Sequence, residues 1–324
     1  MKKLLIIPIL LALLTVFFWP KFSLTSPLSS FKPDISNTPT PTPKPSQAII
    51  GLAGDLGLGR HITSTARLKN DFTWSFGGVA SWLQQNDLNI ANLESPITDP
   101  CPEGLTGTFT FCGDKRFLPQ LSQNKFILTL ANNHILNYGQ SGLKQTYDFL
   151  SQYQIPFYYS HQDDYKFTTQ TIDNISFGFL GYDLVTYPPS IANNIAQSEL
   201  IEQIISDISQ YNNQVDWLVI SLHWGNEYLP QAETWRINLA HRLIDAGADI
   251  IHGHHPHVIQ PSEIYKDKPI FYSLGNFIFD QSWSYETSHS HLIRLTLSQN
   301  SILDTNIAPI TIRNNSRPEI ETID

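Results

Sequence analysis

The sequence predicts an α/β domain with a largely parallel sheet, because short apolar runs alternate with amphipathic helical segments from residue 48 onward. Several runs are apolar at every position rather than at alternate ones, which is typical of strands covered on both faces. With 41% apolar and 12% aromatic residues, the 324-residue chain has enough apolar side chains for one large core. We expect one globular domain over residues 48–312, followed by a tail over 313–324.

Residues 1–20 predict a targeting element that lies outside the fold. Lys2 and Lys3 precede the uncharged run Leu4–Trp19, which as a helix would be about 24 Å long against a hydrocarbon core of about 30 Å. This pattern predicts a signal anchor in the cell membrane, with a cleaved signal peptide as the alternative. Because both lysines precede the apolar run, we expect the rest of the chain to be extracytoplasmic in either case.

Residues 21–47 predict an extended linker between this element and the domain. They are rich in Pro, Ser and Thr and end in TPTPTPKPS. Such a segment has no apolar period and favours polyproline geometry. We expect it to hold the domain away from the membrane.

The charge of the chain excludes one class of partner. The formal net charge is -9 and the pI is about 5.6. This balance leaves no basic surface for a phosphate backbone, so no nucleic acid is expected as a partner.

Seven apolar runs are the candidate strands of the domain. In chain order they are Ala48–Ala53, Leu88–Ala91, Phe126–Leu130, Ile175–Gly181, Trp217–His223, Asp249–His252 and Ile270–Leu274. The helical period is clearest in Leu143–Tyr153 and Thr234–Ala246, where apolar residues recur at intervals of three or four. The second of these helices is expected to stop at Gly247.

Polar residues follow most of these runs, where the carboxyl ends of parallel strands collect functional groups. Along the chain these residues are Asp55, Asn92, Glu94, Asn132, Asn133, His134, His223, His252, His254, His255 and His257. Four histidines within six residues after one strand favour a metal centre over hydrogen-bonded structural histidines. Carboxylate, amide and imidazole donors without thiolates suit Mn, Fe, Zn or Mg. The sequence therefore predicts two binding sites for divalent metal ions. Such ions would activate a water molecule and neutralise the charge of a phosphoryl group.

Two other chemistries lack their motifs. The chain has no GxSxG turn for a serine nucleophile. The glycines between Gly51 and Gly59 match neither GxGxxG nor a Walker loop.

The two cysteines, Cys101 and Cys112, are eleven positions apart in CPEGLTGTFTFC. In an exported chain such a pair predicts a disulfide that closes this loop. A metal or redox pair is the alternative, and the spacing fits neither CxxC chemistry nor a zinc finger.

Six motifs of this chain, in this order, resemble those of the CapA, or poly-γ-glutamate capsule synthesis, proteins. They are GDLGLGR (54–60), ANLESPIT (91–98), LANNHILNYG (130–139), SLHWGNEY (221–228), GHHPHVIQ (253–260) and YSLGNFIFD (272–280). The resemblance places the chain in the calcineurin-like metallophosphoesterase superfamily. It implies a four-layer α-β-β-α sandwich with a metal centre at the strand ends.

The resemblance also implies roles for the residues that follow the strands. Asp55 would be a ligand of the first metal, and Glu94 would stand where related enzymes place a bridging Asp. Asn133 and His223 would bind the second metal.

The remaining imidazole ligands would come from the histidine cluster. The resemblance favours His254 and His257 as these ligands, with His255 as the alternative. His134 would be catalytic, contacting a phosphate oxygen and protonating or stabilising the leaving group.

Four further motif residues are candidates for substrate contacts. They are Arg60, Asn92, Glu227 and Asn276. Arg60 would clamp an anionic substrate or pair with surface acids, and Asn276 would bind substrate or order its loop.

The chain departs from the related enzymes at two positions. The active phosphoesterases read Asp-x-His at the first strand, whereas Asp55 is followed by Leu56 and Gly57. The first metal site therefore lacks one imidazole. Within the CapA group the third residue after the His is usually Asp, and here it is Asn137.

The function implied is that of a metal-dependent hydrolase or transferase acting on a phosphoryl or acyl linkage of an anionic envelope polymer or its precursor. The alternative is a non-catalytic polymer-binding subunit of a membrane complex for capsule synthesis or export, which the missing imidazole favours. A peptidase or amidase acting on γ-glutamyl bonds is a third option.

Overall fold

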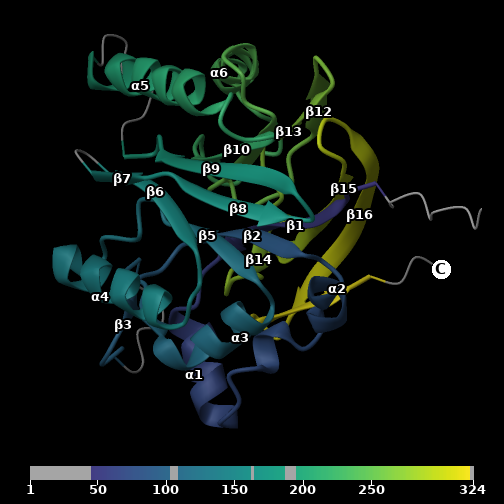
Figure 1. Cartoon of the computed structure of the whole chain (residues 1–324). Coiled ribbons are helices and arrows are strands. Elements are labelled where there is room, and N and C mark those ends of the chain that lie inside the picture. The colour runs from purple at the N-terminus through teal and green to yellow at the C-terminus, as the bar shows by residue number, and fades with distance from the viewer. Residues whose placement is uncertain (1–44, 103–108, 162–163, 187–194, 322–324) are drawn as a thin grey trace, which may run out of the picture. The chain divides into compact units, whose positions relative to one another are not determined.

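The computed structural model describes residues 45–102, 109–161, 164–186 and 195–321. The expected anchor, and nearly all of the expected linker, lie outside these residues. Within them, no helix combines the length and the apolar character needed to span a bilayer. The described part of the chain contains two large β-sheets with helices on their outer faces (Figure 1).

The first sheet has parallel strands in its middle and antiparallel strands at its edges. In spatial order its strands are β17 (Arg317–Ile320), β16 (Ile302–Arg313), β15 (His289–Leu297), β1 (Ala48–Leu56), β2 (Leu88–Leu93), β5 (Phe126–Thr129), β6 (Phe157–His161) and β7 (Asp164–Lys166). Strand β14 (Asn276–Ile278) runs parallel to the end of β1. Strands β1, β2, β5 and β6 are parallel, so their carboxyl ends lie at one edge.

The second sheet has the same plan. In spatial order its strands are β12 (Ser262–Tyr265), β13 (Lys268–Phe271), β11 (Ile250–His254), β10 (Trp217–His223), β9 (Ile175–Asp183) and β8 (Thr168–Ile172). The inner strands β9, β10, β11 and β13 are parallel, and β8 and β12 close the edges in the antiparallel direction. A short separate ladder joins β3 (Ile97–Thr98) to β4 (Gly113–Asp114).

Helices cover the outer face of each sheet. Those beside the first sheet are α1 (Arg60–Lys69), α2 (Ala80–Gln84), α3 (Leu118–Gln123) and α4 (Gly139–Gln152), with the 3₁₀ turns η1 (Trp74–Phe76) and η2 (Lys115–Phe117). Those beside the second sheet are α5 (Ile195–Tyr211) and α6 (Thr234–Asp245), while the short α7 (Tyr285–Ser288) precedes β15. This order of layers confirms the predicted four-layer α-β-β-α sandwich.

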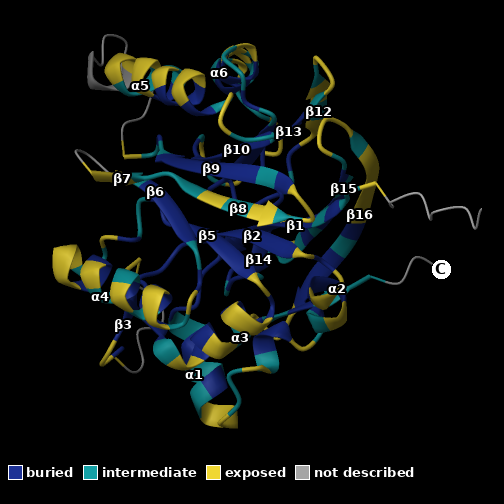
Figure 2. Ribbon diagram, in the orientation of Figure 1, coloured by how far each residue is buried: buried dark blue, intermediate teal, exposed yellow. Residues whose placement is uncertain are grey.

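The strands are apolar on both faces because each face meets a different core. On β10, Trp217 and Val219 pack between the sheets, whereas Leu218 and Ile220 pack against the helices. All four are buried, and the central strands of both sheets are buried along most of their length, whereas edge strands such as β8 and β12 are partly exposed (Figure 2). The uninterrupted apolar runs in the sequence therefore reflect a sheet covered on both faces.

Phe179 provides a test of the core between the sheets. Its ring is fully buried on β9 among residues of both sheets. We expect Phe179→Ala to lower the free energy of unfolding by about 3–5 kcal/mol, because the lost contacts leave a cavity. Urea denaturation would measure this, with Leu68→Ala, at a side chain that is 90% exposed, as the near-neutral control. Equal midpoints for the two variants would contradict this packing.

The C-terminal part of the first sheet was not among the predicted strands. Strands β15 and β16 form a long antiparallel pair, and β17 lies within the segment 313–324. The exposed positions on β16 interrupt its apolar pattern, so the sequence of this strand does not show the apolar run that predicts a buried strand. The helix end at Gly247 is confirmed, since α6 stops at Asp245 and Gly247 has a φ of 116°.

Candidate metal centre

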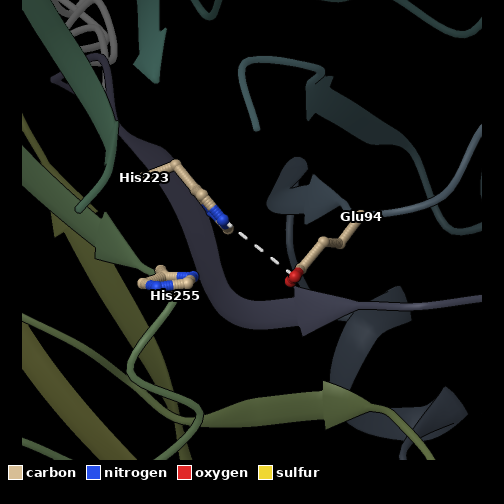
Figure 3. Close-up of side chains that lie close together, drawn as sticks. All are labelled: Glu94, His223 and His255. Atoms are coloured by element: carbon tan, nitrogen blue, oxygen red, sulfur yellow. Dashed lines mark ion pairs between the residues drawn. The ribbon is translucent and has the colours of Figure 1, made fainter. Parts of the chain in front are cut away.

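The polar residues that follow the strands converge where the two sheets end. Asp55 on β1 is in register with Asn92 on β2, and His223 on β10 is in register with His254 on β11. Because these strands are parallel within each sheet, their carboxyl ends deliver side chains from both sheets to one place. Figure 3 shows His223 pointing toward Glu94, with His255 beside them.

Three overlapping groups of side chains have the donors of a metal site, and the ligand atoms within each group all lie within 4.8 Å of one another. The groups are Asp55 with Glu94 and His257, Glu94 with His223 and His255, and Glu227 with His255 and His257. Glu94 belongs to the first two groups, so its carboxylate lies between them. This arrangement offers two adjacent positions for a cation with one shared carboxylate.

Glu94 is fully buried, and its Oε1 has no hydrogen-bond partner within the described structure. Around this oxygen lie His257 Nε2 at 3.6 Å, His134 Nε2 at 3.9 Å and His223 Nε2 at 4.0 Å. Burial and the nearby charge of Asp55 hold the pKa of Glu94 well above its usual value. A cation at this position would satisfy the oxygen and stabilise its ionised form.

Asp55 is also fully buried, but its surroundings favour its charged form. It accepts hydrogen bonds from Asn92 Nδ2 at 2.8 Å and from the backbone N–H of His255 at 3.1 Å. Burial raises its pKa, but contacts with His254 and the nearby His257 and His223 outweigh burial and hold the pKa below its ordinary value. Asp55 is therefore a carboxylate in the form that binds metal.

Asn276 fixes the orientation of His257. Asn276 Nδ2 donates to Thr287 O at 3.0 Å, which turns its Oδ1 toward His257 Nδ1 at 2.9 Å. His257 Nδ1 must then carry the proton, and the lone pair of Nε2 faces Glu94. This is how proteins commonly orient a metal-binding imidazole. Asn276, a candidate substrate residue in the sequence, is fully buried here.

His223 lies between two asparagines. Its Nδ1 is 3.2 Å from Asn92 Nδ2, and its Nε2 is 3.0 Å from Asn133 Oδ1. Burial holds the pKa of His223 well below its usual value, so the imidazole is neutral. Asn92 is fully buried and accepts a bond from Asn132 Nδ2 at 2.9 Å, so it connects the ends of β1, β2 and β10.

His255 and His257 differ from His254 in how they reach the centre. Their φ values are 93° and 58°, in the left-handed region that non-glycine residues rarely adopt. Burial lowers the pKa of His255 to about 3, so it is a neutral donor. His254 Nδ1 lies 3.2 Å from Asp55 Oδ1, but His254 is in none of the three groups. The structure thus groups His255 and His257 with the carboxylates.

His134 lies at the side of the centre, and its tautomer is fixed by Asn137. The backbone N–H of Phe111 donates to Asn137 Oδ1 at 2.7 Å, so this atom is the amide oxygen. His134 Nδ1, 3.2 Å from the same oxygen, must therefore donate a proton to it. The unprotonated Nε2 faces Glu94, and the ring stacks on Phe111 with 4.1 Å between ring centroids. Burial lowers the pKa of His134.

Arg60 lies beside the centre and pairs with an acidic residue, which is one of the two roles expected for it. Its guanidinium contacts Asp280 through Nε at 3.0 Å and also through Nη2. It lies 4.4 Å from the Phe111 centroid and 5.8 Å from that of Phe279. A shallow pocket next to it is lined by Gly57, Gly59, Arg60, Phe111, Phe279 and Asp280.

Phe279 also accounts for the glycine at position 57. A Cβ at Gly57 would lie 2.6 Å from Phe279 Cε2, closer than such atoms approach. The Phe279 ring thus fills the space that a side chain at position 57 would enter. Its ring lies 4.9 Å from that of His257. An imidazole at position 57 would therefore require the Phe279 ring to move.

The predicted disulfide between Cys101 and Cys112 is confirmed. Phe111 and Cys112 are buried, and Phe111 carries the stacking contact with His134. The cysteine pair therefore anchors the segment that forms one wall of the candidate centre. Residues 103–108 of this loop lie outside the described structure.

The donor set fits a divalent cation. Glu94 Oε1 is buried without a hydrogen-bond partner in the described residues. Leaving such an atom unsatisfied costs about 1–3 kcal/mol. Oxygen and neutral imidazole donors without sulfur suit Mn, Fe, Zn or Mg.

Sequence comparisons support the family resemblance that the six sequence motifs indicated. The family described as bacterial capsule synthesis protein PGA_cap matches residues 49–281. The PGA biosynthesis protein CapA of Bacillus subtilis (strain 168) is 29% identical over 315 residues, covering 94% of this chain and 79% of the relative. The capsule biosynthesis protein CapA of Bacillus anthracis is 28% identical over 289 residues, covering 84% of this chain and 70% of the relative.

Two solved structures share the fold. A hypothetical protein from Thermus thermophilus has a TM-score of 0.50 and 14% identity, covering 81% of this chain and 98% of its own. A structure described as a novel phosphatase from Mycoplasma pneumoniae has a TM-score of 0.50 and 13% identity, covering 83% and 95%. At these identities the likeness is one of architecture.

Proposed function

Because the chain belongs to the bacterial capsule synthesis protein PGA_cap family, we propose that it is a divalent-metal-dependent hydrolase or transferase. Its substrate is an anionic envelope polymer or its precursor, with the reaction at a phosphoryl or acyl linkage. One observation carries this proposal: the carboxylates of Asp55 and Glu94 meet the buried imidazoles of His223, His255 and His257 in two adjacent ligand groups. The Glu94 oxygen between the groups has no hydrogen-bond partner among the described residues.

Some residues of the centre would bind the cations, and another would transfer a proton. Asp55, Glu94, His223, His255 and His257 would hold the cations, with Asn133 Oδ1 next to His223 Nε2 as a further donor. The bound ions would neutralise charge that develops on the oxygens of the reacting group and would acidify a water molecule. The chain itself orients one donor before binding, because Asn276 holds the proton on His257 Nδ1 and leaves the lone pair of Nε2 for a cation.

His134 is the group that would move a proton. Its Nδ1–H is held by Asn137, so only Nε2 is available to the substrate. A protonated Nε2 would donate to a substrate oxygen or to the leaving group, and the neutral form would accept the proton back. The stack with Phe111 keeps the ring in this position.

The proposal includes an extracytoplasmic location at the cell membrane, membership in a capsule-synthesis membrane complex and no nucleic-acid partner. It is supported by the apolar N-terminal run after two lysines and by the disulfide, which forms in oxidising compartments. Fractionation of cells that express the full chain would test it. Recovery of the protein in the cytosolic fraction with reduced cysteines would reject the location.

The activity is tested by metal analysis and a substrate panel on the purified full chain. We expect bound divalent metal and turnover of a phosphodiester, a phosphomonoester or a γ-glutamyl oligomer, lost with a chelator and restored by Mn, Zn, Fe or Mg. The γ-glutamyl oligomer distinguishes acyl from phosphoryl chemistry. Polymer binding without turnover under any metal would instead favour a non-catalytic polymer-binding subunit.

A further inference from the structure

Two exposed aromatic residues lie at the rim of the metal centre. Tyr228 follows β10 on the loop that carries Glu227, and Trp283 follows β14. Their rings meet edge to face with centroids 5.9 Å apart, and the Tyr228 ring lies 6.3 Å from that of His257. Tyr228 is 41% exposed and Trp283 is 64% exposed. The two rings therefore form a continuous aromatic surface that extends from His257 in the metal centre to solvent.

Trp283 differs from the other tryptophans that the structure describes. Lysine or arginine side chains lie over the rings of Trp74, Trp82, Trp217 and Trp224. Trp235 packs edge to face against Trp224. Within the described residues, the one ring contact of Trp283 is with Tyr228. Its indole face is left open to solvent, where large apolar area is usually kept for binding.

The position of Tyr228 is held by the backbone. Its N–H donates to Pro256 O at 2.9 Å, which ties its loop to the segment that carries His255 and His257. Its φ is 61°, a left-handed conformation that costs a tyrosine about 1–3 kcal/mol. Gln281 Nε2 donates to the Tyr228 hydroxyl at 3.3 Å. These contacts place the ring of Tyr228 rather than leaving it to move freely.

The charges at this rim disfavour an anionic group on the aromatic pair. The Glu227 carboxylate is grouped with His255 and His257, and it interacts with the Tyr228 hydroxyl. The two arginines that act on the centre are already paired, Arg60 with Asp280 and Arg236 with Glu233. A polymer unit that carried its own carboxylate onto the aromatic pair would lie beside the Glu227 carboxylate, and the two like charges would repel each other.

A sugar ring fits these features. The C–H groups on one face of a pyranose are apolar and pack against an aromatic ring, which removes both from water. Its hydroxyl groups then reach an acceptor at the edge, the Glu227 carboxylate. A neutral sugar adds no charge beside Glu227.

We propose that Tyr228 and Trp283 form a sugar-binding subsite, so that the substrate is a glycan whose reacting phosphoryl or acyl group lies at the metal centre. This inference rests on the proposed function for the reacting group, but the sugar contact itself requires no metal. The substrate would then belong to the glycans in which a neutral sugar unit lies next to the linkage that reacts.

The test measures binding separately from turnover. Oligosaccharides of glucose, galactose, rhamnose and N-acetylglucosamine, without phosphoryl groups, are titrated into the chelator-treated full chain by calorimetry. We expect saturable binding of at least one of them, weakened about tenfold or more in Trp283→Ala. Trp283→Phe, which keeps a ring, is expected to retain most of the binding. Tyr165→Ala removes an exposed aromatic side chain elsewhere, on β7, and is the matched control.

Each outcome decides between the proposals. Absence of binding for all four oligosaccharides, or equal binding by Trp283→Ala and the control, overturns the sugar subsite even if the metal-dependent activity is present. Binding of choline or of a γ-glutamyl oligomer at the aromatic pair, in place of sugar, overturns it as well. Sugar binding that depends on Trp283 without any turnover supports the subsite and rejects the proposed reaction.

Discussion

Glu94→Gln is expected to abolish metal binding and activity together while leaving the metal-free protein folded. Glu94 is the carboxylate that the two adjacent ligand groups share, so its loss affects both positions. We expect the affinity for divalent metal to fall by about a hundredfold or more. Turnover of any substrate that the wild-type protein accepts should fall to the level seen with a chelator.

The stability of this variant gives a second readout. In the metal-free protein Glu94 is buried beside Asp55, and burial raises its pKa because the charged form is disfavoured. Glutamine has the same shape without the charge, so metal-free Glu94→Gln should unfold at the same temperature as the wild type or a higher one. Added metal should raise the unfolding temperature of the wild type but not that of the variant.

Glu202→Gln is the matched control, because Glu202 lies on α5 in an exposed ion pair with Arg242. It should bind metal and respond to it as the wild type does. A metal-dependent stabilisation of Glu94→Gln equal to that of the control would contradict the assignment of the shared carboxylate.

The layers of the fold could be predicted because each buried strand leaves its own continuous apolar run in the sequence. Continuous apolar runs on β9 and β10 follow from a sheet that is covered on both faces, and this pattern is visible in sequence. Strand β16 could not be predicted in the same way, because half of its positions are exposed and it is held by pairing with β15 and β17. Backbone pairing of this kind leaves no apolar pattern at the exposed positions of the strand.

The candidate site was predictable in composition but not in detail. The position of polar residues after strands identified Asp55, Glu94 and His223, since parallel strands bring their ends together. The choice between His254 and His255 depends on backbone dihedral angles after β11, where His255 adopts a φ of 93°. A sequence of adjacent histidines does not specify this turn. Pairing of Arg60 with an acid was one of two expectations, but its partner Asp280 lies far away in the chain and could not be named from the sequence.

His134→Ala is expected to lower the turnover number by about 10²–10⁴ while leaving metal affinity unchanged. The reason is positional: His134 Nε2 faces the shared carboxylate, but His134 is in none of the ligand groups. Steady-state kinetics and a metal titration on the same preparation would separate the two effects. His241→Ala, at a partly exposed histidine paired with Glu263, is the control. Loss of metal together with turnover would make His134 a ligand instead.

Asn137→Asp tests the same histidine without removing it. The aspartate would still accept the Phe111 N–H and the His134 Nδ1–H, but it would add a negative charge 3.2 Å from the ring. Burial lowers the pKa of His134, and an opposite charge favours its protonated form, so this substitution should raise that pKa by about one unit or more. Because the proton-donating form is lost as pH rises through that pKa, the alkaline limb of the turnover profile should move to higher pH. An alkaline limb at the same pH in both proteins would mean that His134 donates no proton in the reaction.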